Sequence, residues 1–212
     1  MKDRVSQISH KESSQKNLAI LIDHIRLRNF PIALEDFLAT QCAFDTFLMV
    51  TYKKSFKPVI ICPTDPAEQS ETLHNYINHS YVLDPLFNAI QGGIAPGITR
   101  LVEIMPDSFE TTEYYQNCYQ DFGLVDEIDL IIDLDNQVTC AITLGRKDNL
   151  GSITRAELKA LNEIYPVINA LVRQFWLSQA SEYLQYERSE GPMKQALKTF
   201  ASGVLTQRER EI

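Results

Sequence analysis

The clearest structural signal in the chain is the stretch from Val125 to Leu144, VDEIDLIIDLDNQVTCAITL. It holds two runs rich in Ile, Val, Leu and Thr, which are joined by Asp135-Asn136, residues typical of tight turns. In the second run, large apolar residues alternate with Thr or Ala from Val138 onward, so the two sets face opposite sides of a strand. The stretch therefore predicts an antiparallel hairpin with strands over 125–134 and 138–144.

A second hairpin is predicted upstream of the first. Residues 44–52 and 56–62 are both rich in aromatic and β-branched residues and are separated by three polar residues. Pro58 cannot donate a ladder hydrogen bond, so its strand should lie at a sheet edge or carry a bulge. A short fifth strand is expected over 98–104.

Helical spacing fills the rest of the chain. We expect helices over 18–29, over 31–38 with Pro31 in the first turn, over 65–79 with Asp65 as cap, and over 107–122 closed by Gly123. Thr154 and Glu157 form a capping box that opens a long helix containing Pro166 and running to about Tyr186. The polar residues 1–10 are expected to be a flexible tail.

This order of elements predicts an α+β domain. Antiparallel strands with helices between them give a sheet of about five strands flanked by helices, followed by a long C-terminal helix. The order resembles that of GAF and PAS sensor domains.

Composition excludes several classes of protein. The chain has 212 residues, 44% of them hydrophobic, and a formal net charge of −8, which is ordinary for a globular protein. It contains no apolar run long enough for a membrane span or a signal peptide, so we expect a cytoplasmic protein without a membrane partner. The four cysteines are widely spaced and are expected to be buried thiols.

The charge is unevenly distributed. Residues 1–28 hold six basic and three acidic residues, whereas residues 100–136 hold one basic and ten acidic residues. An acidic chain does not wrap nucleic acid by itself. We interpret the acidic band as a solvated face.

Enzymatic motifs are absent from the sequence. It has no glycine-rich phosphate loop, no Gly-x-Ser-x-Gly and no His-Glu-x-x-His. His74 and His79 are five positions apart and do not share a helical face. The acidic residues after Val125 fit strand and turn positions better than a metal site. We therefore predict no enzyme, no metal and no cofactor.

The C-terminal residues 205–212, LTQREREI, contain a second capping box, Thr206 with Glu209. A helix that stops there is too short to be stable alone, so we expect more protein to follow. The string resembles the opening of the helix-turn-helix domain of LuxR-type transcriptional regulators. The resemblance implies promoter DNA as a partner, bound by a domain largely missing from this chain, with Thr206 and Glu209 as capping residues and not base contacts.

Residues 74–87, HNYINHSYVLDPLF, hold the candidate ligand contacts Tyr76, Tyr81 and Asp84. They are similar to a motif of acyl-homoserine-lactone receptors, in which the aspartate hydrogen-bonds the ligand amide. Here the spacing to Asp84 is one residue shorter, and no Trp precedes Tyr76. Aromatic rings with polar tips suit a small, largely apolar ligand. The alternative is that the tyrosines are packing residues and Asp84 caps a helix starting at Pro85.

A longer resemblance is to LuxR-type regulators with a GAF-like sensor. It rests on Asp84-Pro85, on Glu113-Tyr114-Tyr115, on the segment 123–127, and on Pro166 followed by Phe175-Trp176. It implies that Tyr115 is a further candidate contact, and that the chain divides into a sensory domain over 11–187, a linker over 188–204 and the first turns of a helix-turn-helix domain over 205–212.

The function implied is the sensory part of a DNA-binding transcriptional regulator, controlled by a small molecule or by dimerisation. The long helix could form the seam of a homodimer, although core packing alone would also explain its apolar stripe. Two alternatives remain open: a receptor specific for acyl-homoserine lactone, and a free-standing dimeric interaction module without DNA binding.

Overall fold

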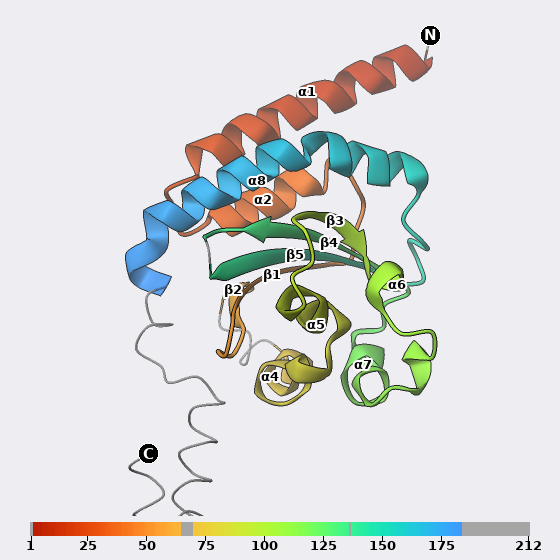
Figure 1. Cartoon of the computed structure of the whole chain (residues 1–212). Helices are drawn as coiled ribbons and strands as arrows, with labels where there is room; N and C mark the ends of the chain where they lie inside the picture. Colours follow the sequence, from red (N-terminus) through yellow and green to blue (C-terminus); the bar gives the residue numbers. More distant parts are fainter. Residues whose placement is uncertain (1, 65–69, 136, 184–212) are drawn as a thin grey trace, which may run out of the picture.

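One antiparallel sheet of five strands, in the order β2-β1-β5-β4-β3, lies at the centre of the computed structural model, which describes residues 2–64, 70–135 and 137–183 (Figure 1). The strands are β1 Thr46–Lys53, β2 Val59–Cys62, β3 Gly97–Arg100, β4 Asp126–Asp133 and β5 Val138–Arg146. The first of the predicted hairpins, β4 with β5, pairs Ile128 with Leu144 and Ile132 with Cys140. The side chain of Asp135 accepts hydrogen bonds from the backbone N–H groups of Gln137 and Val138, as expected of a turn residue.

The second predicted hairpin is also present. Strand β1 pairs with β2 on one side and with β5 on the other, and β2 forms an edge of the sheet. Pro58 directly precedes β2, and the register with β1 shifts between Met49 and Val50. Both features agree with the prediction that the missing N–H of Pro58 confines its strand to an edge or a bulge.

Three helices cover one face of the sheet: α1 Lys2–Asp23, α2 Phe30–Leu38 and α8 Arg155–Tyr183 (Figure 1). Their apolar sides form the main core with the sheet residues of that face, and the rings of Phe30 and Phe175 stack at a centroid distance of 4.7 Å. Burying such aromatic side chains is a large part of what holds a layer on a sheet.

Two expectations for the N-terminal region are wrong. Residues 2–10, expected to be a flexible tail, are helical and belong to α1. No Gly or Pro occurs between residues 2 and 23 to interrupt the helix. The first helix also ends at Asp23 and not near Asn29, because turns over 24–29 reverse the chain and allow α2 to pack against α1. Pro31 does lie in the first turn of α2.

The capping box at the start of α8 is confirmed. The Thr154 hydroxyl accepts a hydrogen bond from the Glu157 backbone N–H at 3.3 Å, and the Glu157 carboxylate accepts one from the Thr154 backbone N–H at 2.9 Å. Glu157 also forms an ion pair with Arg146 at the end of β5. The pair ties the start of α8 to the sheet.

Shorter elements cover the opposite face (Figure 1). They are α4 Glu71–Asn78, η1 Ser80–Leu83, α5 Pro85–Gln91, α6 Leu101–Ile104, η2 Phe109–Thr111, the π-helical turn η3 Tyr115–Tyr119, and α7 Gln120–Phe122. Gly123 adopts a left-handed φ of 65° after α7, as predicted for a C-terminal glycine.

Three boundaries on this face differ from expectation. Helix α4 is capped by Ser70 and not by Asp65, which lies with Pro66 outside the described residues. The strand expected over 98–104 ends at Arg100, where α6 begins. The helix expected over 107–122 is divided into η2, η3 and α7.

The predicted fold class is confirmed: a GAF-like α+β arrangement of a five-stranded antiparallel sheet, flanking helices and a long C-terminal helix. Within the described residues, no helix is both long and apolar enough to cross a membrane. The predicted linker over 188–204 and the predicted helix-turn-helix start over 205–212 lie outside the described residues.

Candidate ligand-binding site

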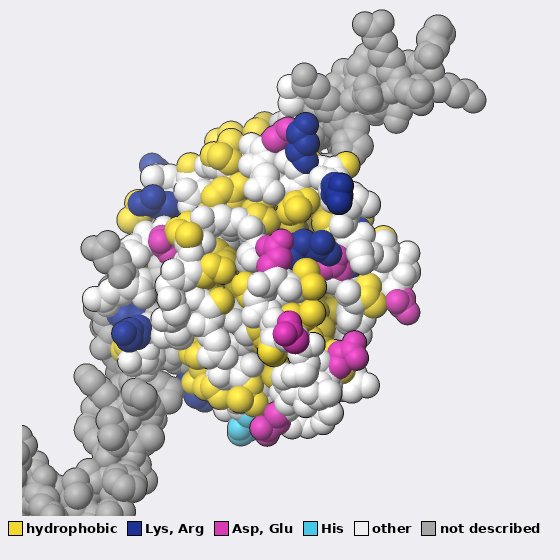
Figure 2. Space-filling view, turned by 45° about the vertical axis from the view of Figure 1, so that its right-hand side comes forward, with side chains coloured by type: hydrophobic (Ala, Val, Ile, Leu, Met, Phe, Trp, Pro, Cys, Tyr) yellow, Lys and Arg dark blue, Asp and Glu magenta, His cyan; other side chains and the backbone are white. Residues whose placement is uncertain are grey.

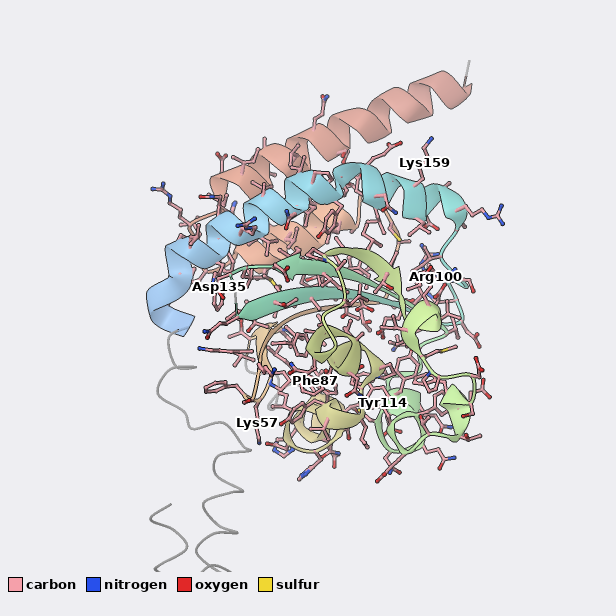
Figure 3. All side chains as sticks on the ribbon, in the orientation of Figure 1. Lys57, Phe87, Arg100, Tyr114, Asp135 and Lys159 are labelled. Atoms are coloured by element: carbon pink, nitrogen blue, oxygen red, sulfur yellow. The ribbon has the colours of Figure 1, made fainter. Side chains whose placement is uncertain are left out.

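A cavity of about 280 Å³ lies between the sheet and the shorter elements that cover it. Strands β1, β4 and β5 form one wall, and α4, α5, η3 and α7 with their flanking residues form the others. In Figure 3 the labelled Tyr114 and Phe87 lie on this side of the sheet, while Lys159 on α8 lies on the other. The described residues lining the cavity are Thr46, Phe47, Leu48, Tyr52, Pro63, Ser70, Leu73, Tyr76, Asp84, Leu86, Tyr114, Tyr119, Phe122, Leu124, Glu127 and Thr143.

Strand alternation decides which sheet residues reach the cavity. In β4, Ile128, Leu130 and Ile132 join the main core beneath α1, α2 and α8. The residues between them, including Glu127 and Asp129, therefore face the other side. Glu127 thus lines the cavity, and Asp129 is buried on the same face of the strand.

A hydrogen-bonded chain of three side chains spans one end of the cavity. The Tyr76 hydroxyl donates to Asp84 Oδ2 at 2.7 Å, and the Tyr52 and Tyr76 hydroxyl oxygens lie 3.2 Å apart. Asp84 Oδ1 accepts from the Leu86 backbone N–H at 2.8 Å, which caps α5. Burial raises the pKa of Asp84 to about 6, although the hydrogen bonds from Tyr76 and the backbone oppose this rise.

Two more carboxyl groups approach the cavity from β4. Asp129 is fully buried; its Oδ1 accepts a hydrogen bond from the Thr143 hydroxyl at 2.7 Å, and its Oδ2 has no partner among the described residues. Glu127 lines the cavity and is 9% exposed. Burial raises the pKa of Asp129 to about 7, and burial together with the charges of Asp129 and Asp84 raises that of Glu127 well above its usual range.

Aromatic rings form the wall beside these carboxyl groups. Tyr119 packs against Phe109 at a centroid distance of 5.1 Å and against Tyr114 at 6.1 Å. Burial, followed by the charges of Glu127 and Asp129, raises the pKa of Tyr119. The phenol therefore lies within electrostatic reach of both carboxyl groups.

The structure brings together two of the four predicted ligand contacts. Tyr76 and Asp84 both line the cavity and are hydrogen-bonded to each other. Tyr81 is buried against the edge of the Phe87 ring, with centroids 5.2 Å apart, and does not line this cavity. Tyr115 packs on Phe109 and borders a separate hollow near Arg100. Thr206 and Glu209 lie outside the described residues.

Sequence reasoning did not select Tyr52, Glu127 or Asp129 as site residues. Two acidic residues at alternate positions of a buried strand share one face, and this signal was available in the segment EID at 127–129. The acidic residues were instead interpreted as strand and turn positions. Tyr52 gave no such signal, because its place beside Tyr76 depends on how β1 packs against α4.

The cavity is suited to hold a small molecule with an apolar body. Most of its lining is aromatic or aliphatic, and a few converging hydroxyl and carboxyl groups can orient a ligand. Ser70 is already engaged as the cap of α4 through the Leu73 backbone N–H. Among the described residues, no group of three His, Cys, Asp or Glu side chains is placed to bind a metal ion.

Comparison with known proteins gives two informative similarities and no match to any family model. The chain is 27% identical over 135 residues, 61% of its length and 68% of the relative's, to a protein of Aeromonas salmonicida named as an HTH-type transcriptional regulator in the exeN 3′ region. Its fold matches the crystal structure of the VqsR LBD domain from Pseudomonas aeruginosa with a TM-score of 0.67 and 22% identity, covering 76% of this chain and 94% of that one.

Proposed function

We propose that this chain is the sensory part of a LuxR-type transcriptional regulator, and that the cavity beside Tyr76 and Asp84 receives its signal molecule. The observation that carries the proposal is the cavity itself, which is mostly apolar and contains a few convergent polar groups. The relative named as an HTH-type regulator and the fold of the VqsR LBD domain support a regulatory role. Such a regulator acts in the cytoplasm, where its promoter DNA is.

The proposed mechanism is a shift between two arrangements of a homodimer. The cavity is walled by short helices on one face of the sheet, whereas α1 and α8 lie on the other (Figure 1). A ligand that binds one arrangement more tightly than the other shifts the population by that difference in affinity. Helix α8 leads toward residues 205–212, so its position in the dimer would set the spacing of two DNA-binding domains on adjacent half-sites.

Native mass spectrometry tests the proposal most directly. The protein is purified from its natural host and measured under gentle and then under dissociating conditions. We expect a dimer that carries a discrete extra mass, which is lost as one small molecule when the protein is dissociated. A protein that carries no ligand and gains no stability from extracts of its host would overturn the proposal.

A matched pair of variants shows whether such a ligand occupies the cavity. Leu73 is buried and lines the cavity, whereas Leu83 is 43% exposed on η1. Leu73→Trp should fill the cavity and abolish the extra mass, and Leu83→Trp should leave it unchanged. If both variants retain the extra mass equally, the ligand does not occupy this cavity.

A receptor specific for acyl-homoserine lactones is the second candidate, because Asp84 and a tyrosine do meet in the cavity. In that case an N-acyl lactone should raise the melting temperature of the wild type but not of Asp84→Asn. A free-standing interaction module is the third candidate, and a stop codon directly after Ile212 in the natural reading frame would favour it.

A further inference from the structure

Some polar groups in and near the cavity have hydrogen-bond partners, and others have none. At one end, both oxygens of Asp84 accept hydrogen bonds, from Tyr76 and from the backbone of Leu86. Elsewhere in the lining, the carboxyl group of Glu127 makes no hydrogen bond to any described residue, and Asp129 Oδ2, buried nearby on the same face of β4, has no partner. Buried polar groups in folded proteins are nearly always paired, so this end of the cavity lacks hydrogen-bond donors.

The missing partner is not a basic side chain of the described part of the protein. The lining residues found there include no Lys, Arg or His. Arg100 borders a separate hollow that Glu127 also lines; it forms an ion pair with Asp126 at 2.5 Å, and its buried Nε has no hydrogen-bond partner among the described residues. Asp84 and Glu127 therefore face one largely apolar space, with Asp129 buried near Glu127 on β4, and the described lining supplies no basic side chain.

The surroundings of Glu127 and Asp129, the carboxyl pair of β4, also favour the binding of a cation. Tyr119 lies close enough to Glu127 and Asp129 for their charges to act on its phenol, and tyrosine rings bind ammonium groups on their faces. In Figure 2 Asp and Glu side chains gather at the lower right, while Lys and Arg side chains of this face lie at its centre, top and left. A negative surface raises the local concentration of cations.

We infer that the cavity takes a small organic amine in its cationic form, with the ammonium group against Glu127 and the apolar body against the tyrosine and leucine side chains. The inference rests on the proposed function and specifies the chemistry of its ligand. An ammonium group offers three donors, which matches the unpaired oxygens, whereas a neutral alcohol offers one and a carboxylate offers none.

Binding of the amine should release a proton. Without a ligand, the carboxyl pair faces Asp84 from α5, Tyr52 from β1 and Tyr119 from η3, none of which supplies positive charge. Burial therefore keeps protons on the pair. When R–NH₃⁺ enters, one carboxyl group transfers its proton to buffer and becomes the counter-ion of the ammonium group, so charge in the cavity stays balanced.

The test uses three probes of one shape and different charge: tryptamine, tryptophol and indole-3-acetate. Affinity for the full chain is measured by titration calorimetry at pH 7, in phosphate and in Tris buffer, which differ in ionisation enthalpy. We expect tryptamine to bind about tenfold more tightly than tryptophol, as a charged hydrogen bond in a buried site implies. We also expect proton release for tryptamine alone. Phenethylamine and phenylethanol provide the same comparison of amine with alcohol for a ligand with a smaller apolar group.

The variant Glu127→Gln keeps the size of the side chain and removes its charge. It should abolish the preference for the amine over the alcohol, while Glu163→Gln on the exposed side of α8 should leave both affinities unchanged. Thermal melting of each variant shows that it is folded.

Three results would overturn the inference: equal or tighter binding of the alcohol or the acid, no binding by either amine, or an amine preference that survives in Glu127→Gln. Binding of Mg²⁺ or Ca²⁺ in place of the amine, lost in the same variant, would also overturn it. A neutral or anionic molecule that co-purifies with the protein would contradict the amine but sustain the proposed function. A protein without any ligand would contradict the proposed function as well.

Discussion

The Tyr76 hydroxyl donates a 2.7 Å hydrogen bond to Asp84 Oδ2 and so joins α4 to the N-terminus of α5. Both side chains are buried, and Asp84 is 5% exposed. Asp84 therefore has two roles, as the cap of α5 and as part of the cavity wall. A ligand that moves Asp84 would move the helix that it caps.

Removing the hydroxyl should destabilise the protein. Tyr76→Phe leaves Asp84 Oδ2 buried without its donor, and we expect a loss of about 1 to 3 kcal/mol in the free energy of unfolding. Urea denaturation monitored by circular dichroism measures it. Tyr81→Phe is the matched control. Burial alone raises the pKa of the Tyr81 phenol, so removing this hydroxyl should cost clearly less free energy of unfolding. Equal losses for the two variants would show that the bond to Asp84 contributes nothing specific.

The ion pair of Arg146 with Glu157 should be the more important of two pairs on α8. Arg146 is buried and also donates to the Ala43 carbonyl oxygen at 2.7 Å, so it links β5, α8 and the segment before β1. Arg146→Met should lower the free energy of unfolding by about 3 kcal/mol, since Glu157 and the Ala43 carbonyl oxygen lose their partner. The exposed pair Lys159–Glu163 is the control, and Lys159→Met should cost under about 1 kcal/mol.

The ion pair of Arg146 with Glu157 should also affect unfolding in acid. Burial alone would raise the pKa of Glu157, but hydrogen bonds from Arg146 and Thr154 lower it to about 2. A carboxyl group whose pKa is lowered by folding contributes stability above its unfolded pKa and loses it as pH falls. The wild type should therefore lose this contribution between about pH 4.5 and pH 2. Glu157→Gln should be less sensitive to acid in that range, and a change identical to that of the wild type would contradict this origin.

The cavity carboxyl groups should give the opposite pH dependence at higher pH. Folding raises the pKa of Asp129 from 3.8 to about 7 through burial, so the folded state holds more protons than the unfolded state between these values. Stability should fall as pH rises across this range, by at most about 1.4 kcal/mol per pH unit for one group. Asp129→Asn should flatten the slope, whereas Asp107→Asn on the surface should not; urea midpoints at pH 4.5, 5.5, 6.5 and 7.5 would show the difference.

The proposed homodimer can be tested on α8. Leu177 is 63% exposed, and the next residue of α8, Ser178, has its Oγ 3.4 Å from the carbonyl oxygen of Ile25 in the turns that follow α1. If this face forms the dimer seam, Leu177→Glu should weaken the dimer about tenfold or more, because it buries a charge in an apolar interface. Leu83→Glu, on the cavity side of the sheet, is the control. Analytical ultracentrifugation measures dimer dissociation of both variants. If the two dissociate equally, the dimer interface does not include this part of α8.

The fold could be predicted because its signals are local. Alternation in residues 138–144, the missing N–H of Pro58 and the capping box at Thr154 each act within a few residues, and the structure has the hairpin, the edge strand and the helix start in those places. The errors fall where local signals were weak. Residues 2–10 have no apolar stripe that would have marked them as helix, and Ser70 gave no stronger capping signal than Asp65.

The candidate site could be predicted only in part. Tyr76 and Asp84 are eight residues apart and belong to one recognisable segment, whereas Tyr52 reaches them from another strand. Glu127 and Asp129 had the spacing of neighbours on one face, but the sequence did not show whether that face was exposed to solvent. The face is buried because the layer of short helices covers β4.

The two hairpins, the edge strand, the start of the long helix and the lack of recognisable catalytic motifs could be predicted from the sequence, because these depend on residue type and short-range spacing. Only the folded chain shows that Asp84 and Glu127 line one cavity with no basic side chain among its described lining, and that Asp129 is buried near Glu127. Charge and burial in such a space are set by segments far apart in the chain, and the physical cost of leaving Asp129 Oδ2 unpaired exists only once those segments have closed over it.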